Sequence, residues 1–193
     1  MEGKDYEIVL PQGYESVLTI DATDKKFALR MNLAALIPMV PAMLLAWRMI
    51  WNMPVAYFPQ KMLGFFAAML LYVVLHELVH GVAYRVLTHR KLTFGLKLTC
   101  AYCGVPDIYC YRRTALISLL APFTVFTILF AALAVFLGDT MLRACAVILL
   151  GMHLGGCSGD LYDSWLYLTR FRDPLTLMRD TGPAQTFYVK AEG

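Results

Sequence analysis

Four long apolar runs constrain the fold of this chain more than any other feature of its sequence. They cover residues 31–51, 62–88, 114–137 and 141–170, and each carries few charged residues. A helix of about 20 apolar residues is long enough to cross the hydrocarbon core of a bilayer. The composition agrees, because 59% of the residues are hydrophobic and only 16% are charged. The sequence therefore predicts an all-α membrane protein with four transmembrane helices.

The remaining segments are predicted to be small elements of the same single domain of 193 residues. Residues 1–30 form an arm with two short strand-like stretches. In residues 90–113, apolar side chains alternate with glycine and polar ones from Phe94 onward, which is typical of a strand. Ile108–Tyr111 is expected to return beside it, which completes a β-hairpin between the second and third helices. Residues 171–193 form a C-terminal tail.

The distribution of basic residues predicts the orientation in the membrane. Fourteen of the 17 Lys and Arg residues lie in the arm, in the last turn of the second run and the segment after it, or at the end of the fourth run and in the tail. The opposite side has only Arg48, Lys61 and Arg143. Basic residues favour the cytosolic side, so both termini and the hairpin are expected to face the cytosol, in a bacterial plasma membrane. The net charge of +3 is too small to indicate a nucleic-acid partner.

The second run contains a motif with recognisable chemistry, His76-Glu77-Leu78-Val79-His80. Two histidines four residues apart lie on one face of a helix, where both can reach a single Zn²⁺ ion. Glu77, next to His76, can act as general base on a zinc-bound water. Two buried histidines in a polar helix contact are the alternative. Ionisable groups at membrane depth are costly and usually functional, which favours the metal site.

A zinc site needs a third protein ligand, and helix depth selects Asp160. His80 lies 8 residues before the expected cytosolic end of its helix, and Asp160 lies 9 residues before the end of the last helix. Both therefore sit at a similar depth. Asp163 is the second choice. His153 has three alternative roles: another ligand, a hydrogen-bond donor to the transition state, or a core histidine.

Two further features are noted around this motif. Pro122 lies at a similar depth in the third run, where it should kink the helix and free a carbonyl group. Cys100 and Cys103 have the spacing of a metal pair, although plain thiols are the simpler interpretation in a reducing cytosol.

Several motifs together resemble a bacterial membrane family described as putative zincin peptidases, which is similar to the site-2 proteases, intramembrane zinc enzymes. They are the His-Glu motif in a membrane helix, Ala121-Pro122-Phe123 and Gly159-Asp160. The resemblance covers roughly residues 11–172. It implies that His76, His80 and Asp160 bind zinc and that Glu77 is the catalytic carboxylate. In the last helix, His153 stands roughly where site-2 proteases carry an Asn, which makes it a second catalytic candidate.

The sequence thus predicts an intramembrane zinc metalloprotease that hydrolyses a peptide bond of a membrane protein or peptide near the cytosolic side. The residues 91–113 could pair with an extended substrate or could simply lie on the membrane surface. The alternative function is that of a non-proteolytic zinc protein: a transporter, a sensor or an inactive scaffold. A transporter needs a polar path, and the first and third runs offer almost no polar residues.

Overall fold

A computed structural model describes residues 5–53, 58–96 and 101–191 of the chain. The chain divides into two compact units. We call residues 30–76 and 122–158 the helical unit, and residues 1–29, 77–121 and 159–193 the sheet unit. The division falls between His76 and Glu77, inside one continuous helix.

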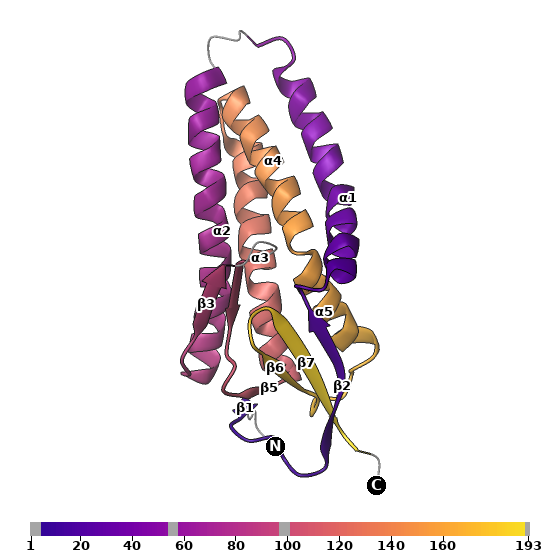
Figure 1. Ribbon diagram of the computed structural model, residues 1–193. Helices are drawn as coiled ribbons and strands as arrows, with labels where there is room; N and C mark the ends of the chain where they lie inside the picture. The colour runs from indigo at the N-terminus through magenta and orange to yellow at the C-terminus, as the bar shows by residue number, and fades with distance from the viewer. Residues whose placement is uncertain (1–4, 54–57, 97–100, 192–193) are drawn as a thin grey trace. The chain divides into compact units, whose positions relative to one another are not determined.

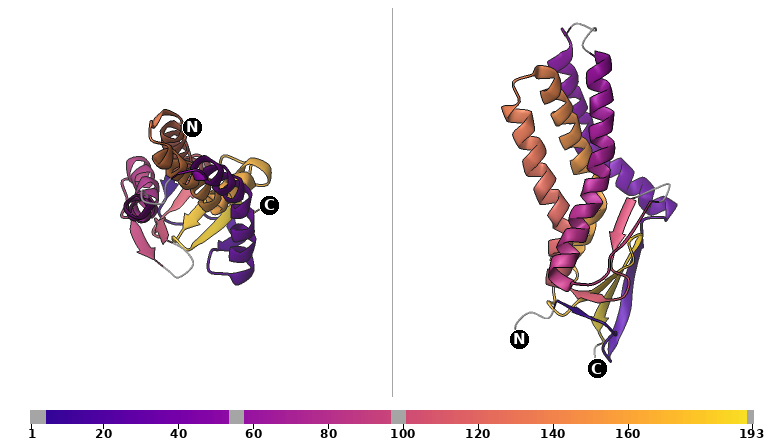
Figure 2. Two further views of the ribbon diagram at one scale, coloured as in Figure 1. Left: turned by 90° about the horizontal axis from the view of Figure 1, so that it is seen from above. Right: turned by 90° about the vertical axis from the view of Figure 1, so that its left-hand side faces the viewer.

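The helical unit consists of four helices or parts of helices that run side by side (Figures 1 and 2). They belong to α1 (Lys25–Ile50), α2 (Phe58–Thr88), α3 (Arg112–Phe136) and α4 (Thr140–Gly156). Tyr72 of α2 packs its ring against Phe126 and Phe130 of α3, with centroid distances of 5.2 and 5.4 Å. Gly155 brings α4 close to α1, since a Cβ atom there would lie 2.7 Å from the Ala35 carbonyl oxygen.

Among the residues that the structure describes, three helices are long and apolar enough to cross a membrane: α1, residues 61–88 of α2, and α3. Helix α4 and α5 (Ser158–Thr169) meet the same criterion only as a pair with a bend between them. The sequence predicted one continuous fourth helix, but the chain leaves helical geometry at Cys157, which caps α4. Many large apolar side chains face outward, including Ile37, Leu70 and Val135. These features are compatible with a membrane protein.

The sheet unit contains a five-stranded antiparallel sheet in the order β1-β5-β6-β7-β2 (Figure 1). Its strands are β1 (Tyr6–Glu7), β5 (Tyr109–Tyr111), β6 (Leu177–Asp180), β7 (Ala184–Lys190) and β2 (Tyr14–Asp21). The fold is mostly helical, as expected. Strands were expected in the arm and in the hairpin but not in the tail, so the five-stranded sheet was not predicted. The sheet combines segments that the sequence pattern divides into an arm, a hairpin and a tail. Only long-range pairing reveals that they form one sheet.

The hairpin before α3 differs from its prediction. Strand β3 (Thr93–Leu96) pairs with β4 (Ala101–Gly104) in a separate two-stranded sheet. The expected return strand around Tyr109–Tyr111 pairs instead with β1 and β6. Each of these segments had strand character, and the choice of partner depended on packing that the local pattern does not contain.

The core of the sheet unit lies where β6 and β7 meet the ends of α2, α3 and α5. Tyr167 of α5 contacts Phe187 of β7 with ring centroids 5.0 Å apart, and both side chains are fully buried. Tyr84 of α2 and Leu119 of α3 belong to the same cluster. This core fixes the helix segments of the sheet unit that carry Glu77, His80 and Asp160.

Candidate metal centre

The two histidines of the motif lie on successive turns of α2, one in each unit. His76 and His80 are 8% and 7% exposed, and Glu77 between them is half-buried. Residues four apart on a continuous helix share a face. Because α2 runs without a break through these positions, its local geometry orients both imidazoles toward the same side.

Contacts within the sheet unit determine which ring nitrogen of His80 carries the hydrogen. Its Nδ1 atom lies 2.8 Å from the backbone carbonyl oxygen of Ser118 on α3. A carbonyl can only accept a hydrogen bond, so Nδ1 must carry the hydrogen and donate it. The other ring nitrogen, Nε2, lies 3.4 Å from Oδ2 of Asp160, in the first turn of α5. His80 therefore directs Nε2 toward a carboxylate.

The separation of these two atoms fits a shared metal ion. A charge-assisted N–H···O hydrogen bond is about 2.7–2.9 Å long, which is shorter than the observed 3.4 Å. Two ligand atoms bound to tetrahedral zinc with bonds of about 2.0–2.1 Å are about 3.3 Å apart. Imidazole nitrogen and carboxylate oxygen are both usual zinc ligands. The donor set therefore matches zinc in chemistry and in spacing.

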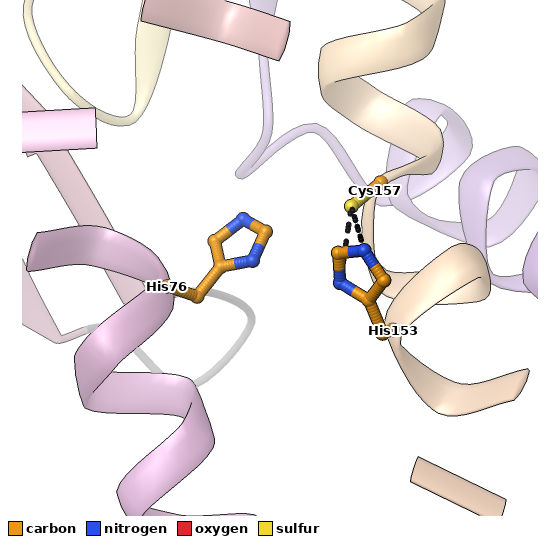
Figure 3. Close-up of side chains that lie close together, drawn as sticks. All are labelled: His76, His153 and Cys157. Carbon is orange, nitrogen blue, oxygen red and sulfur yellow. Dashed lines mark hydrogen bonds between the residues drawn. The ribbon is translucent and has the colours of Figure 1, made fainter. Parts of the chain in front are cut away.

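A second cluster surrounds His153 in the helical unit, and Figure 3 shows His153 with Cys157 and with His76 opposite. His153 is fully buried. Its Nδ1 atom lies 2.9 Å from the Tyr72 hydroxyl, and its Nε2 atom lies 3.2 Å from the Phe123 carbonyl oxygen. The Cys157 sulfur lies 3.6 Å from Nδ1. The Tyr72 hydroxyl also lies 3.2 Å from Nδ1 of His76.

The donors and acceptors of this cluster select one tautomer for each neutral histidine. The Phe123 carbonyl only accepts, so Nε2 of His153 donates to it and Nδ1 of His153 accepts from the Tyr72 hydroxyl. The Tyr72 oxygen then accepts from Nδ1 of His76. In this tautomer Nε2 of His76 carries no hydrogen, as a metal-binding ring nitrogen requires. Both motif histidines thus present Nε2, although two unrelated sets of contacts hold them.

His76, His153 and Cys157 also offer ligand atoms within 4.8 Å of one another. The Tyr72 hydroxyl is hydrogen-bonded to a ring nitrogen of each of the two histidines. These hydrogen bonds account for the proximity of the rings without a second metal. Cys157 is fully buried.

Asp163, the alternative third ligand, is buried within α5. Its Oδ1 atom has no hydrogen-bond partner among the residues that the structure describes. The carboxylate that faces His80 is that of Asp160. The Cys100–Cys103 hypothesis cannot be followed, since Cys100 lies outside the described residues. Cys103 is buried, and burial raises the pKa of its thiol to about 12.

Asp180 of β6 is a buried acid that the sequence did not single out. It accepts a 2.7 Å hydrogen bond from the hydroxyl of Tyr84, one turn beyond His80 on α2. The Gly182 amide and the Gln185 side chain donate to its other oxygen. Burial nevertheless raises its pKa to about 6. This contact links the motif-bearing end of α2 to the sheet.

Some residues of the centre were missed in the sequence. Tyr72 lies four residues before His76, on the same helix face, and that spacing was an available signal. Pro122, four residues after Ser118, indicated that a carbonyl group of this helix would lack its usual donor. The sequence did not indicate which side chain would donate to it.

The chain also matches a known protein family. A family described as putative zincin peptidase matches residues 69–173, which is more than half of the chain and includes both histidines, Glu77 and Asp160. No curated protein and no solved structure matched the chain.

Proposed function

The chain belongs to the putative zincin peptidase family, which implies a zinc cofactor, and from this premise we propose that it is an intramembrane zinc metalloprotease. Its zinc ligands are His76, His80 and Asp160. The observation that carries the proposal is the geometry of His80, whose Nδ1 atom is held by a carbonyl while Nε2 lies 3.4 Å from the Asp160 carboxylate. Such outer contacts are typical of metal-binding histidines.

Each protein group has a defined part in the proposed hydrolysis. When bound, zinc acidifies water and polarises a carbonyl group. Glu77, next to His76, accepts the proton of the attacking water and returns it to the amine that leaves the broken peptide bond. Asp160 and Glu77 together carry a charge of −2 when ionised, which balances the charge of a zinc ion in an apolar environment.

His153 is assigned a positioning role in this proposal. Both of its ring nitrogens have hydrogen-bond partners, Tyr72 on one side and the Phe123 carbonyl on the other. These contacts favour a role in which His153 orients His76 through Tyr72, rather than one in which His153 binds zinc itself.

The sheet supports a four-span topology with both termini on one side of the membrane, the side that the basic residues predict to be cytosolic. Strands from the N-terminal arm, from the segment before α3 and from the C-terminal tail pair within one sheet, so they lie on the same side of any membrane. If α1 and α2 both cross, the chain returns to that side before β5. Helix α3 then requires a return crossing before β6, which only α4 and α5 together can provide.

The substrate is proposed to be a membrane-associated protein or peptide, cleaved near the cytosolic side of the bilayer. The sheet unit contains the basic segments expected in the cytosol as well as His80 and Asp160. A catalytic centre in this part of the chain is therefore expected toward the cytosolic ends of the helices.

Zinc content tests the proposal. We would measure zinc per chain in detergent-purified wild type, His80→Ala and Asp160→Ala, with His89→Asn as the matched histidine control. Asparagine suits this position because His89 has a positive φ of 55°. About one zinc ion in wild type and in the control, with loss in both site variants, is expected. A wild type without zinc would overturn the enzyme function.

A further inference from the structure

A proline in the middle of α3 changes the hydrogen bonding of that helix. Pro122 lies ten residues into the helix. In an α-helix, each backbone N–H donates to the carbonyl four residues earlier, and proline has no N–H. The carbonyl left without its usual donor is therefore that of Ser118.

The Ser118 carbonyl is used by the candidate metal centre. Ser118 is fully buried, where an unsatisfied carbonyl would be costly. Nδ1 of His80 lies 2.8 Å from this oxygen and donates to it. One contact thus satisfies the carbonyl that Pro122 releases and places the hydrogen of His80 on Nδ1.

We propose that Pro122 is a positioning residue of the zinc site, which acts by leaving the Ser118 carbonyl to His80 so that Nε2 of His80 is the metal-binding atom. This inference rests on the proposed function for its zinc ligand. The hydrogen-bond arrangement itself belongs to the zinc-free chain and can be tested without metal.

The inference makes an unusual prediction for Pro122→Ala. Alanine restores an N–H group that competes with His80 for the Ser118 carbonyl. The carbonyl has two lone pairs, so the contact with His80 weakens but is not abolished. Zinc affinity should fall about tenfold, the lower end of the range for residues that orient metal ligands. The zinc-free variant should unfold at an unchanged or higher temperature, because proline disfavours helix interiors.

Pro41→Ala is the matched control. Pro41 also lies inside a helix, α1, and its substitution makes the same chemical change in a helix other than α3. We would measure zinc affinity by competition with a fluorescent chelator, and the melting temperature in the presence of EDTA. The expected pattern is weakened zinc binding in Pro122→Ala alone, without loss of thermal stability.

A spectroscopic readout separates positioning from a general structural effect. ¹⁵N NMR of the His80 ring in zinc-free protein at alkaline pH reports which nitrogen carries the hydrogen. Wild type and Pro41→Ala should show it on Nδ1, and Pro122→Ala should show a mixture. A wild-type ring with its hydrogen on Nε2 would overturn the inference, even if the variant failed to fold. So would unchanged zinc affinity in folded Pro122→Ala.

The outcomes also distinguish this inference from the proposed function. If wild type bound no zinc while His80 still carried its hydrogen on Nδ1 in a Pro122-dependent way, the enzyme proposal would fail. Pro122 would then still orient His80, but not for zinc binding. Zinc binding with no dependence on Pro122 would leave the proposed function intact and exclude the role of Pro122.

Discussion

The Tyr72 hydroxyl donates a 2.9 Å hydrogen bond to Nδ1 of His153 and accepts one from Nδ1 of His76 over 3.2 Å. A tyrosine on α2 thereby connects a motif histidine with a fully buried histidine of α4. The arrangement fixes the tautomer of His76 through its hydrogen bond to the Tyr72 hydroxyl.

Tyr72→Phe should weaken zinc binding about tenfold, because His76 loses the acceptor that holds its hydrogen on Nδ1. The affinity would be measured by chelator competition. Tyr109→Phe removes a hydroxyl from β5 of the sheet unit, where the ring packs against Tyr188, and should bind zinc as wild type does. Equal affinities for wild type and Tyr72→Phe would refute the role of the hydroxyl.

Glu77→Gln should keep one zinc ion per chain and lose hydrolysis. An amide cannot accept the proton of the attacking water, and loss of a general base costs about 10²- to 10⁴-fold in rate. Cleavage of fluorescently labelled β-casein in detergent would be followed for both proteins. Cleavage that persists at the wild-type rate in this variant would exclude Glu77 as the base.

Asp180 should make stability depend on pH in a direction opposite to that of most carboxylates. Its folded pKa of about 6 lies above the ordinary value of 3.8, so the folded state binds more protons between these values. Stability should therefore fall as pH rises from about 4 to about 6, by about 3 kcal/mol, and then level off. The free energy of unfolding in detergent across this range is the measurement.

The matched variants for this effect are Asp180→Asn and Asp107→Asn. Asparagine at 180 keeps the shape and most hydrogen bonds of the buried side chain while it removes the titration. Asp107, exposed in the turn before β5, serves as the control and should leave the pH dependence in place. An unchanged pH profile in Asp180→Asn would assign the effect to another group.

Two glycines near the bend between α4 and α5 should respond differently to alanine. At Gly155 a new Cβ would lie 2.7 Å from the Ala35 carbonyl oxygen, whereas at Gly159 no atom lies within 4 Å. Gly155→Ala should destabilise the chain by about 1–3 kcal/mol, because backbone must move. Gly159→Ala should be neutral or stabilising. Melting temperatures in detergent would decide, and equal values would contradict the close packing of α1 and α4.

The sequence was most informative where chemistry depends on local spacing. The apolar runs predicted the long helices, since crossing a bilayer needs length and apolarity alone. Helix periodicity placed His76 and His80 on one face. Depth matching selected Asp160, and the structure places its carboxylate 3.4 Å from His80. Zinc binding by these residues stays a prediction.

Other features could not be predicted, because they depend on which segments meet. The pairing of the N-terminal strands with β5 and β7 joins residues more than 100 positions apart. Strand character is local, but the choice of partner is decided by burial and packing. The helix break at Cys157 could not be predicted either, because the neighbouring glycines permit a bend without requiring one.

The sequence by itself determined the membrane-like helices, the types of the candidate ligands and the spacing of the two histidines along α2. Only the tertiary structure decided what holds each motif histidine: the Ser118 carbonyl for His80, and Tyr72 with His153 for His76. The physical reason is that a side chain's identity fixes which atoms can bind a metal, whereas the tautomer and orientation depend on hydrogen-bond partners that other helices provide.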